Sequence, residues 1–313
     1  MTSLRMAAPV VLPARRQWRP IIGLLAACSL MLASVPPVRA AGQPESNLFM
    51  WQVVGPSDSG ASPDYLVGTI HLAMAADHTL PNVALQCLAQ STSFVMEADT
   101  DTLRPETLVP FLFRQDGVSN ETLLSVPAWQ RTLTQAKIVG FGSDQVARME
   151  PWFLTTFLGI GPNDPNRSRD MLLRREAERQ HVPVSYLEKA EDQLRMMQSL
   201  PAPYFFQQIE DLEETTAHNQ ELLQAYDRGD LNGIATATFD PTEMSRFPLV
   251  FQHLFYDRND RWMPEVERLC QTQRAFIAVG LGHLIGDQGL LRRLAAKGYR
   301  ITPLIPAPPA KTR

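Results

Sequence analysis

Two histidines of this chain follow a glycine at the same spacing, each directly after an apolar segment of strand length. In DYLVGTIHL, Gly68 precedes His71 by three residues, and in FIAVGLGHL, Gly280 precedes His283 in the same way. Glu97 stands near the end of another apolar segment, SFVMEAD. Imidazole and carboxylate groups hold divalent metal ions in proteins, and they also transfer protons in hydrolytic reactions. These three side chains therefore predict a metal site or an acid/base site.

The elements that must position these side chains form an alternating pattern. Strand-length apolar segments occur at 48–54, 65–70, 93–99, 182–188, 275–280 and 299–304. Helix-length segments separate most of them, which is typical of α/β proteins with several parallel strand pairs. We therefore predict an α/β fold in which a mixed, partly parallel sheet is flanked by helices, with a helical insertion or cap at about 105–255.

Both Gly-x-x-His segments and Glu97 are expected at the carboxyl ends of strands, where ligands gather in open α/β sheets. Glycine adopts backbone angles closed to other residues, so Gly68 and Gly280 are expected to turn the chain abruptly off each strand. One such spacing arises often by chance and by itself indicates only a turn. Two copies, each followed by leucine, favour a functional role, in which His71, Glu97 and His283 converge as a metal site or an acid/base site. Rings farther apart than about 10 Å would exclude a shared ion.

The first forty residues have the composition of a secretory signal. Arginines but no acidic residues precede the apolar segment 21–35. In the segment VRA, Val38 and Ala40 are the small residues that signal cleavage requires at positions −3 and −1. We predict cleavage after Ala40 and an exported protein, periplasmic or secreted, whose residues 41–313 form a single domain. The alternative is a lipid anchor at Cys28, which ends the lipoprotein-like segment LAAC. The residues after Cys28 stay apolar, which argues against a lipid-anchored chain with a polar tether.

Charge and hydropathy limit the partners of the mature chain. Without residues 1–40 it carries 24 basic and 33 acidic residues, a formal charge of −9. This balance argues against nucleic acid as a partner, because neutralising phosphates requires clustered Lys and Arg. No apolar run after the signal approaches the roughly 18 residues that span a bilayer, so no membrane span is expected in the mature chain.

Two cysteines, Cys87 and Cys270, remain after the signal. Each is expected at the end of a helix that leads into a strand, and adjacent parallel strands would bring those helices together. We therefore predict a disulfide between them in an oxidising compartment. The alternative is two buried thiols, which are common in protein cores.

From these motifs the chain resembles the TraB/GumN family, which is related to the Tiki group of metal-dependent proteases. The resemblance covers about residues 48–305 and rests on YLVGTIHL, MEAD, PVSYLEKAEDQL, RNDRWMPEVE and FIAVGLGHLIGDQGLLRRLAAKGYRI. It implies a metal-dependent hydrolase of the peptidase type, acting on a peptide or another small exported substrate. The site residues that it implies are His71, Glu97, Arg258 and His283, of which the two histidines and the glutamate would hold Mn²⁺, Co²⁺ or Zn²⁺. One departure is Arg169, which precedes Asp170 where many members carry glycine.

Two further residues have competing interpretations. Arg258 would stabilise an oxyanion or bind a substrate carboxylate, or else form a surface ion pair with a neighbouring acidic residue. Glu188 ends a predicted strand and is either a fourth site residue or an N-terminal charge for the following helix. The function also has alternatives, because fold does not fix function. The same pocket would serve a non-catalytic protein that binds a metal or ligand, and the family name suggests an accessory factor in polysaccharide export or conjugation.

Overall fold

The structure is a computed structural model that describes residues 47–56, 63–72, 79–99, 103–138, 140–160, 167–272 and 274–304. The predicted signal at 1–40, with Cys28 inside it, lies outside these residues. No helix in the described ranges is long and apolar enough to cross a membrane.

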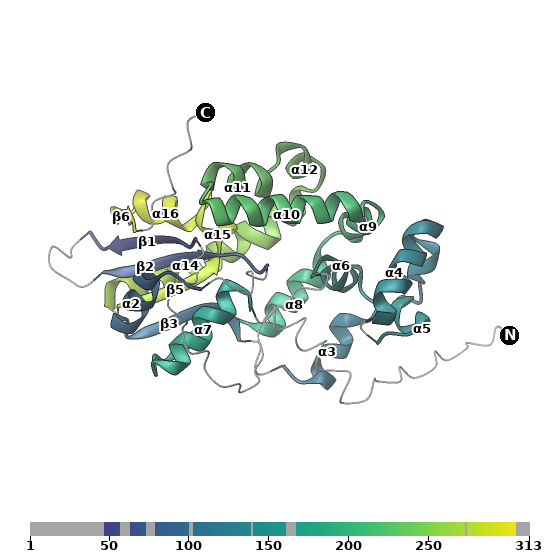
Figure 1. The fold of residues 1–313 in the computed structure, drawn as a ribbon, viewed down its shortest axis with the longest axis horizontal. Helices are drawn as coiled ribbons and strands as arrows, with labels where there is room; N and C mark the ends of the chain where they lie inside the picture. Colours follow the sequence, from purple (N-terminus) through teal and green to yellow (C-terminus); the bar gives the residue numbers. More distant parts are fainter. Residues whose placement is uncertain are drawn as a thin grey trace.

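A six-stranded mixed sheet forms the centre of the fold, seen on the left of Figure 1. Its strands are β1 (Phe49–Val54), β2 (Asp64–Thr69), β3 (Ser93–Asp99), β4 (Val184–Lys189), β5 (Ala275–Gly280) and β6 (Arg300–Pro303). They lie in the order β4-β3-β5-β2-β1-β6. The four strands β4, β3, β5 and β2 run parallel, whereas β1 is antiparallel to both of its neighbours. The prediction of a mixed, partly parallel sheet is confirmed.

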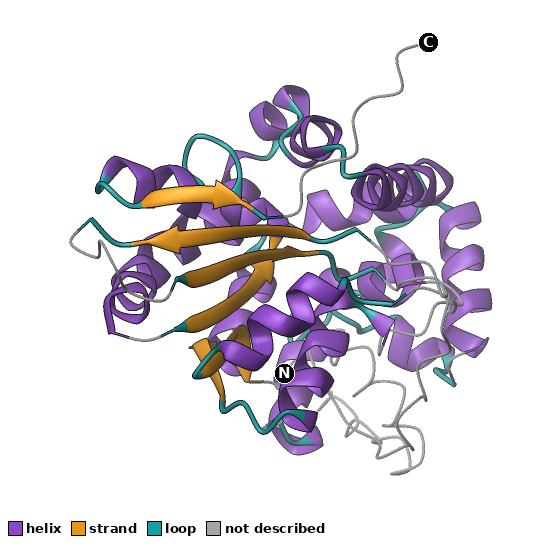
Figure 2. Ribbon diagram, turned by 60° about the vertical axis from the view of Figure 1, so that its left-hand side comes forward, coloured by secondary structure: helices purple, strands orange, loops and turns teal. Residues whose placement is uncertain are grey.

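Alternation along the buried strands sends side chains to two separate cores, because successive strand residues point to opposite faces. In β5, Phe276 and Ala278 join one core, and Ile277 and Val279 join the other. The first core is covered by α2 (Asn82–Gln90) and α7 (Arg169–Arg179). The second is covered mainly by α14 (Asp257–Thr272), α15 (Leu281–Leu284) and α16 (Leu290–Ala296). Figure 2 shows the strands enclosed between helices.

The predicted helical insertion in the middle of the chain is confirmed, but α7 and β4 interrupt the range 105–255 and belong to the sheet and its cover. Part of the insertion has its own core. Helices beside the sheet bury Trp129, Trp152, Phe153 and Phe205 against one another. They are α3 (Pro105–Leu112), α4 (Val126–Ile138), α5 (Ser143–Val146), α6 (Pro151–Ile160), α8 (Ala190–Ser199) and α9 (Ala202–Glu210). The chain then returns to the sheet through α10 (Leu212–Arg228), α11 (Leu231–Thr238), α12 (Pro241–Arg246), α13 (Pro248–Phe251) and the π-helical turn η3 (Gln252–Tyr256). Figure 1 shows α3 to α6 and α9 standing to one side of the strands.

The predicted disulfide is wrong in this structure, because Cys87 and Cys270 are both free thiols. Cys87 packs from α2 against the core on one face of the sheet, whereas Cys270 belongs to α14 and the core on the other face. The two helices do precede neighbouring strands, β3 and β5, as expected. Since they cover opposite faces, the sheet itself separates the two sulfur atoms.

Candidate functional site

Five polar side chains gather at the carboxyl ends of the four parallel strands, and we call these the strand-end cluster. His71 follows β2, Glu97 lies in β3, Glu188 lies in β4, His283 lies in α15 directly after β5, and Arg258 lies in the first turn of α14. Four of the five are buried, and only His71 is exposed, with 53% of its side chain accessible. The carboxyl ends of parallel strands meet at one edge of a sheet, which explains why residues so distant in sequence meet here.

The three predicted ligands converge on Gly280. A Cβ atom at this position would lie 3.2 Å from Glu97 Oε1, 3.7 Å from His283 Cδ2 and 3.8 Å from His71 Nε2. Because both imidazoles lie within 4 Å of the same point, their separation is well below the limit of about 10 Å set by a shared ion. The structure thus brings His71, Glu97 and His283 together; their catalytic and metal-binding roles stay predictions.

The two motif glycines provide space, which corrects the expectation that they adopt unusual backbone angles. Gly280 has φ −52° and ψ 134°, and Gly68 is not among the residues with positive φ. A Cβ on Gly68 would lie 2.4 Å from Leu281 Cδ1, so glycine allows α15 to approach β2. At Gly280 the limiting neighbour is the Glu97 carboxylate, which also accepts a hydrogen bond from the Gly280 backbone N–H at 2.7 Å. Each glycine therefore lets one motif pack closely against its surroundings.

Arg258 lies at the centre of the strand-end cluster, and its alternative as a surface ion pair is wrong. Its Nη2 donates to Glu97 Oε2 at 2.5 Å and to Glu188 Oε1 at 2.6 Å, and its Nε donates to Glu188 Oε1 at 3.1 Å. Its Nη1 lies 3.0 Å from His283 Nε2. The guanidinium also stacks on Trp262, with Cζ 4.5 Å from the ring centroid. Glu188 is accordingly a member of the cluster, which goes beyond its expected role as a helix charge.

A hydrogen-bond partner fixes the far side of each imidazole. Asn259 gives its Nδ2 hydrogens to the backbone oxygens of His283 and Gln288, so its Oδ1 is the acceptor that faces His283 Nδ1 at 2.8 Å. On the other ring, Asp170 Oδ2 lies 3.1 Å from His71 Nδ1. A proton on Nδ1 leaves the Nε2 lone pair of a neutral imidazole directed into the cluster, which is the arrangement that metal-binding histidines use.

The pKa values of the two histidines move in opposite directions. The charge of Asp170 raises the pKa of His71 to about 9, although water screens part of this attraction at a half-exposed ring. Burial, together with the positive charge of Arg258, lowers the pKa of His283 to about 3. At neutral pH His283 is therefore neutral, whereas His71 carries a proton that a metal ion would have to displace.

The two carboxylates of the cluster differ in the same way. Burial alone would raise the pKa of Glu97, but Arg258, the two histidines and the Gly280 N–H outweigh it and hold that pKa far below its ordinary value. Burial dominates at Glu188 and raises its pKa despite the contact with Arg258. Pairs of acids whose environments push their pKa values apart are typical of sites that divide electrostatic and proton-transfer roles between them.

The imidazole and carboxylate groups of the cluster are of the types that bind divalent ions, but their present contacts leave no place for an ion. His71 Nε2, His283 Cδ2 and one oxygen of Glu97 lie within 4 Å of one point, and His283 Nε2 faces Arg258. The two buried carboxylates of the cluster share the single guanidinium of Arg258. However, both oxygens of Glu97 and the Nε2 of His283 already face the Gly280 N–H or Arg258. Accordingly, no group of three or more His, Cys, Asp or Glu among the described residues is placed to hold a metal ion. An ion would have to take Glu97 and His283 from Arg258.

Sequence reasoning missed three residues that hold the cluster. Asp170 was singled out only for its unusual neighbour Arg169, yet it orients His71 and also accepts a hydrogen bond from Thr69. Asn259 stands next to Arg258 in the segment RND, but its partner His283 is 24 residues away in sequence. Trp262 donates to Glu188 Oε2 at 3.2 Å. Asn259 and Trp262 lie in the quoted motif RNDRWMPEVE, whereas Asp170 was marked only by its neighbour Arg169.

Comparison with known proteins gives this geometry a context. The model of the TraB/PrgY/gumN family matches residues 49–303, which include every member of the strand-end cluster. The chain belongs to the TraB/PrgY/gumN family. Relatives include the protein named Metalloprotease TIKI2 of Danio rerio, 25% identical over 87% of this chain, and the uncharacterized protein YbaP of Shigella flexneri and Escherichia coli, 25% identical over 79% of it.

The relatives differ in how much of them this chain covers. It spans 64% of the Danio rerio protein but 94% of YbaP. No significant match was found among solved structures. The family is therefore established by sequence, and within it one relative is named as a metalloprotease and the other as uncharacterized.

Proposed function

We propose that this member of the TraB/PrgY/gumN family is an exported metal-dependent hydrolase that cleaves peptide bonds. The observation that carries the proposal is the convergence of His71, Glu97 and His283 on Gly280, with both imidazole Nδ1 atoms fixed from behind. The name of the Danio rerio relative supports a metalloprotease activity in the family. Export rests on the composition of residues 1–40.

In this proposal His71, His283 and Glu97 would hold a divalent ion, for which Mn²⁺, Co²⁺ and Zn²⁺ are the candidates. Such an ion, when bound, would lower the pKa of a water molecule that serves as the nucleophile. Asp170 and Asn259 keep the two imidazoles oriented through their Nδ1 atoms. The buried carboxylates of Glu97 and Glu188 share the guanidinium of Arg258, and protonated His71 adds positive charge near Glu97 that a divalent ion would replace.

The remaining groups suit the acid/base and charge-stabilising steps. Glu188 is the carboxylate whose pKa is raised, so it is the better proton acceptor at neutral pH. Arg258 is fully ionised and buried, and a guanidinium in such a place stabilises negative charge that develops on a carbonyl oxygen. A bound ion would take both Glu97 and His283 from Arg258, and the freed guanidinium nitrogens would then be available to a substrate oxygen.

The test is cleavage of a peptide library by purified protein that begins at Ala41, measured by mass spectrometry. We expect cleavage with at least one of Mn²⁺, Co²⁺ and Zn²⁺, none with a chelator, and loss of more than about a hundredfold in rate for His71→Ala or His283→Ala. The matched control is His218→Ala, since His218 is exposed on α10.

Two outcomes would contradict this proposal. If calorimetry detects metal binding but no peptide is cleaved, the protein binds a metal ion without acting as a hydrolase. Cleavage that persists in both His71→Ala and His283→Ala would show that the strand-end cluster is not the active centre.

A further inference from the structure

We infer that the outer edge of β4 binds an extended segment of the polypeptide substrate as an added strand, and that this segment carries a lysine or arginine. The inference rests on the proposed peptidase function and names the substrate class of the same site. Three observations carry it: the place of β4 in the sheet, the hollow beside it, and the charge of that hollow.

β4 is the end strand of the sheet on the side of the parallel strands. Its other side pairs with β3, and the backbone oxygen of Pro183 accepts from Phe94 at 2.8 Å. Backbone groups of alternate residues point to alternate sides of a strand, so the inward direction at position 183 places those of Val184, Tyr186 and Glu188 on the outer side. An extended peptide is the ligand that such an edge recognises through its main chain.

A hollow of about 1350 Å³ lies along this strand and is open to solvent. All six residues of β4 line it, together with the start of α8 and with Asp257, Arg261 and Trp262 from α14. The strand itself is only partly covered, whereas β2 is buried along its whole length. The space and exposure needed by an added strand are therefore present.

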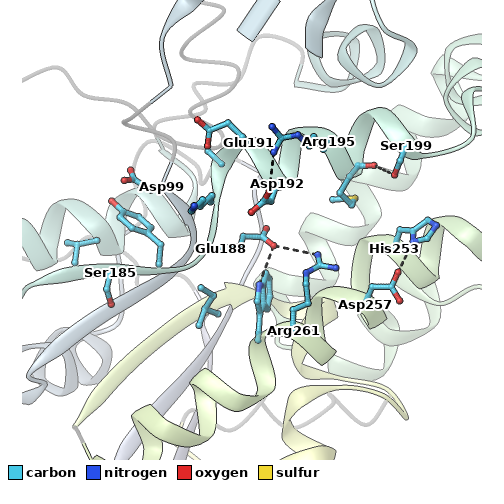
Figure 3. Close-up of a pocket in the computed structure, with 17 residues that line it drawn as sticks. Asp99, Ser185, Glu188, Glu191, Asp192, Arg195, Ser199, His253, Asp257 and Arg261 are labelled. Atoms are coloured by element: carbon cyan, nitrogen blue, oxygen red, sulfur yellow. Dashed lines mark hydrogen bonds and ion pairs between the residues drawn. The ribbon is translucent and has the colours of Figure 1, made fainter. Parts of the chain in front are cut away.

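Glu188 connects this hollow to the strand-end cluster. Its side chain lines the hollow, as Figure 3 shows, while its carboxylate accepts hydrogen bonds from Arg258 and Trp262. Neighbouring strands lie about 4.8 Å apart, so a peptide on β4 would run about two strand spacings from Glu97 on β3. Residues of the peptide just past the carboxyl end of β4 would then pass over the cluster.

The charge of the hollow selects the peptide. Five carboxylates line it, those of Asp99, Glu188, Glu191, Asp192 and Asp257. Arg258 already binds Glu188, so the other four face Lys189, Arg195 and Arg261, with His253 2.7 Å from Asp257. Arg195 lies 3.2 Å from Asp192, and Arg261 lies 3.9 Å from Glu188, so these cations are turned toward carboxylates of the hollow itself. The net negative charge favours a peptide with a basic side chain.

The experiment measures binding, with a chelator present so that turnover does not interfere. The probes are fluorescein-labelled hexapeptides of alternating Thr and Val with one central Lys, and the same peptide with Glu in its place. By fluorescence anisotropy we expect the Lys peptide to bind at least tenfold more tightly than the Glu peptide. N-methylation of one alternate set of peptide amides should weaken binding at least tenfold, and methylation of the other set less than twofold.

A variant of the protein tests the charge without touching the cluster. Glu191→Lys should weaken binding of the Lys peptide at least fivefold, whereas Glu213→Lys, the same charge change on the exposed face of α10, should not. Equal binding of both peptides, or equal effects of both methylated sets, would overturn the inference. So would a homodimer in solution that the peptides do not dissociate, because the edge would then be occupied by a second copy of this chain.

The inference and the proposed function fail separately. If the library is cleaved but the hexapeptides do not bind, the β4 edge is not the substrate groove although the hydrolase stands. If the hexapeptides bind with the expected pattern and no peptide is cleaved, the groove stands and the hydrolase falls.

Discussion

Replacing Arg258 by methionine would remove the one buried guanidinium of the strand-end cluster while keeping an unbranched apolar side chain beside Trp262. The change leaves the carboxylates of Glu97 and Glu188 buried without their common partner. Breaking a buried ion pair by removing one partner costs about 3–5 kcal/mol, because the remaining charge is desolvated and uncompensated. We therefore expect the free energy of unfolding to fall by about 3–5 kcal/mol at pH 8 in the presence of a chelator.

The same reasoning fixes the pH dependence of this loss. Without Arg258, burial raises the pKa of both carboxyls in the folded state above their unfolded values. A folded state that binds more protons gains stability as pH falls, so the deficit of Arg258→Met should shrink between pH 8 and pH 5. Glu97 in the unchanged protein has a depressed pKa, and its contribution to stability is lost only in more acidic solution.

Urea unfolding followed by far-ultraviolet circular dichroism measures both quantities. Arg268→Met is the control, because Arg268 lies on the same helix and makes two contacts to Glu265, at 2.8 and 2.6 Å, but both side chains are largely exposed. An exposed pair contributes about 0–1 kcal/mol. A loss in Arg258→Met no larger than in this control, or one that is the same at pH 8 and pH 5, would refute the account of the cluster given above.

Three further variants test separate features. Gly68→Ala should lower the free energy of unfolding by about 1–3 kcal/mol, because the added methyl group would overlap Leu281. Its control is Gly142→Ala, where one atom lies within 4 Å of the added methyl group, and this variant should change the value by less than about 1 kcal/mol; urea unfolding measures both. Between pH 7 and pH 5 the free energy of unfolding should fall, because the unfolded state binds a proton at His283 and the folded state, with its lowered pKa, does not. In the same assay this fall should be smaller in His283→Gln, and an equal fall would contradict the burial argument. Asp170→Asn should lower the pKa of His71 toward its ordinary value in an NMR titration, and an unchanged pKa would show that Asp170 does not hold the proton.

Local sequence pattern predicted the elements well because it reports burial. The apolar segment before Gly280 is a buried strand, and the two histidines meet because parallel strands end at one edge. What the pattern does not report is which face of a sheet a helix covers, and this is why the disulfide between Cys87 and Cys270 was wrongly predicted. Arg258 was similarly uncertain from its acidic neighbours, since only the tertiary fold turns it inward toward Glu97.

The position of β5 in the sheet has a consequence for when the protein becomes functional. β5 begins at Ala275, yet in the sheet it lies between β2 and β3, which come much earlier in the sequence. Until it is inserted, the pair β1–β2 and the pair β3–β4 have no strand to join them, so long-range pairing must precede assembly of the cluster. A nascent chain would thus lack an assembled strand-end cluster until β5 has been synthesised. Any hydrolytic activity would be delayed until nearly the whole polypeptide has been delivered.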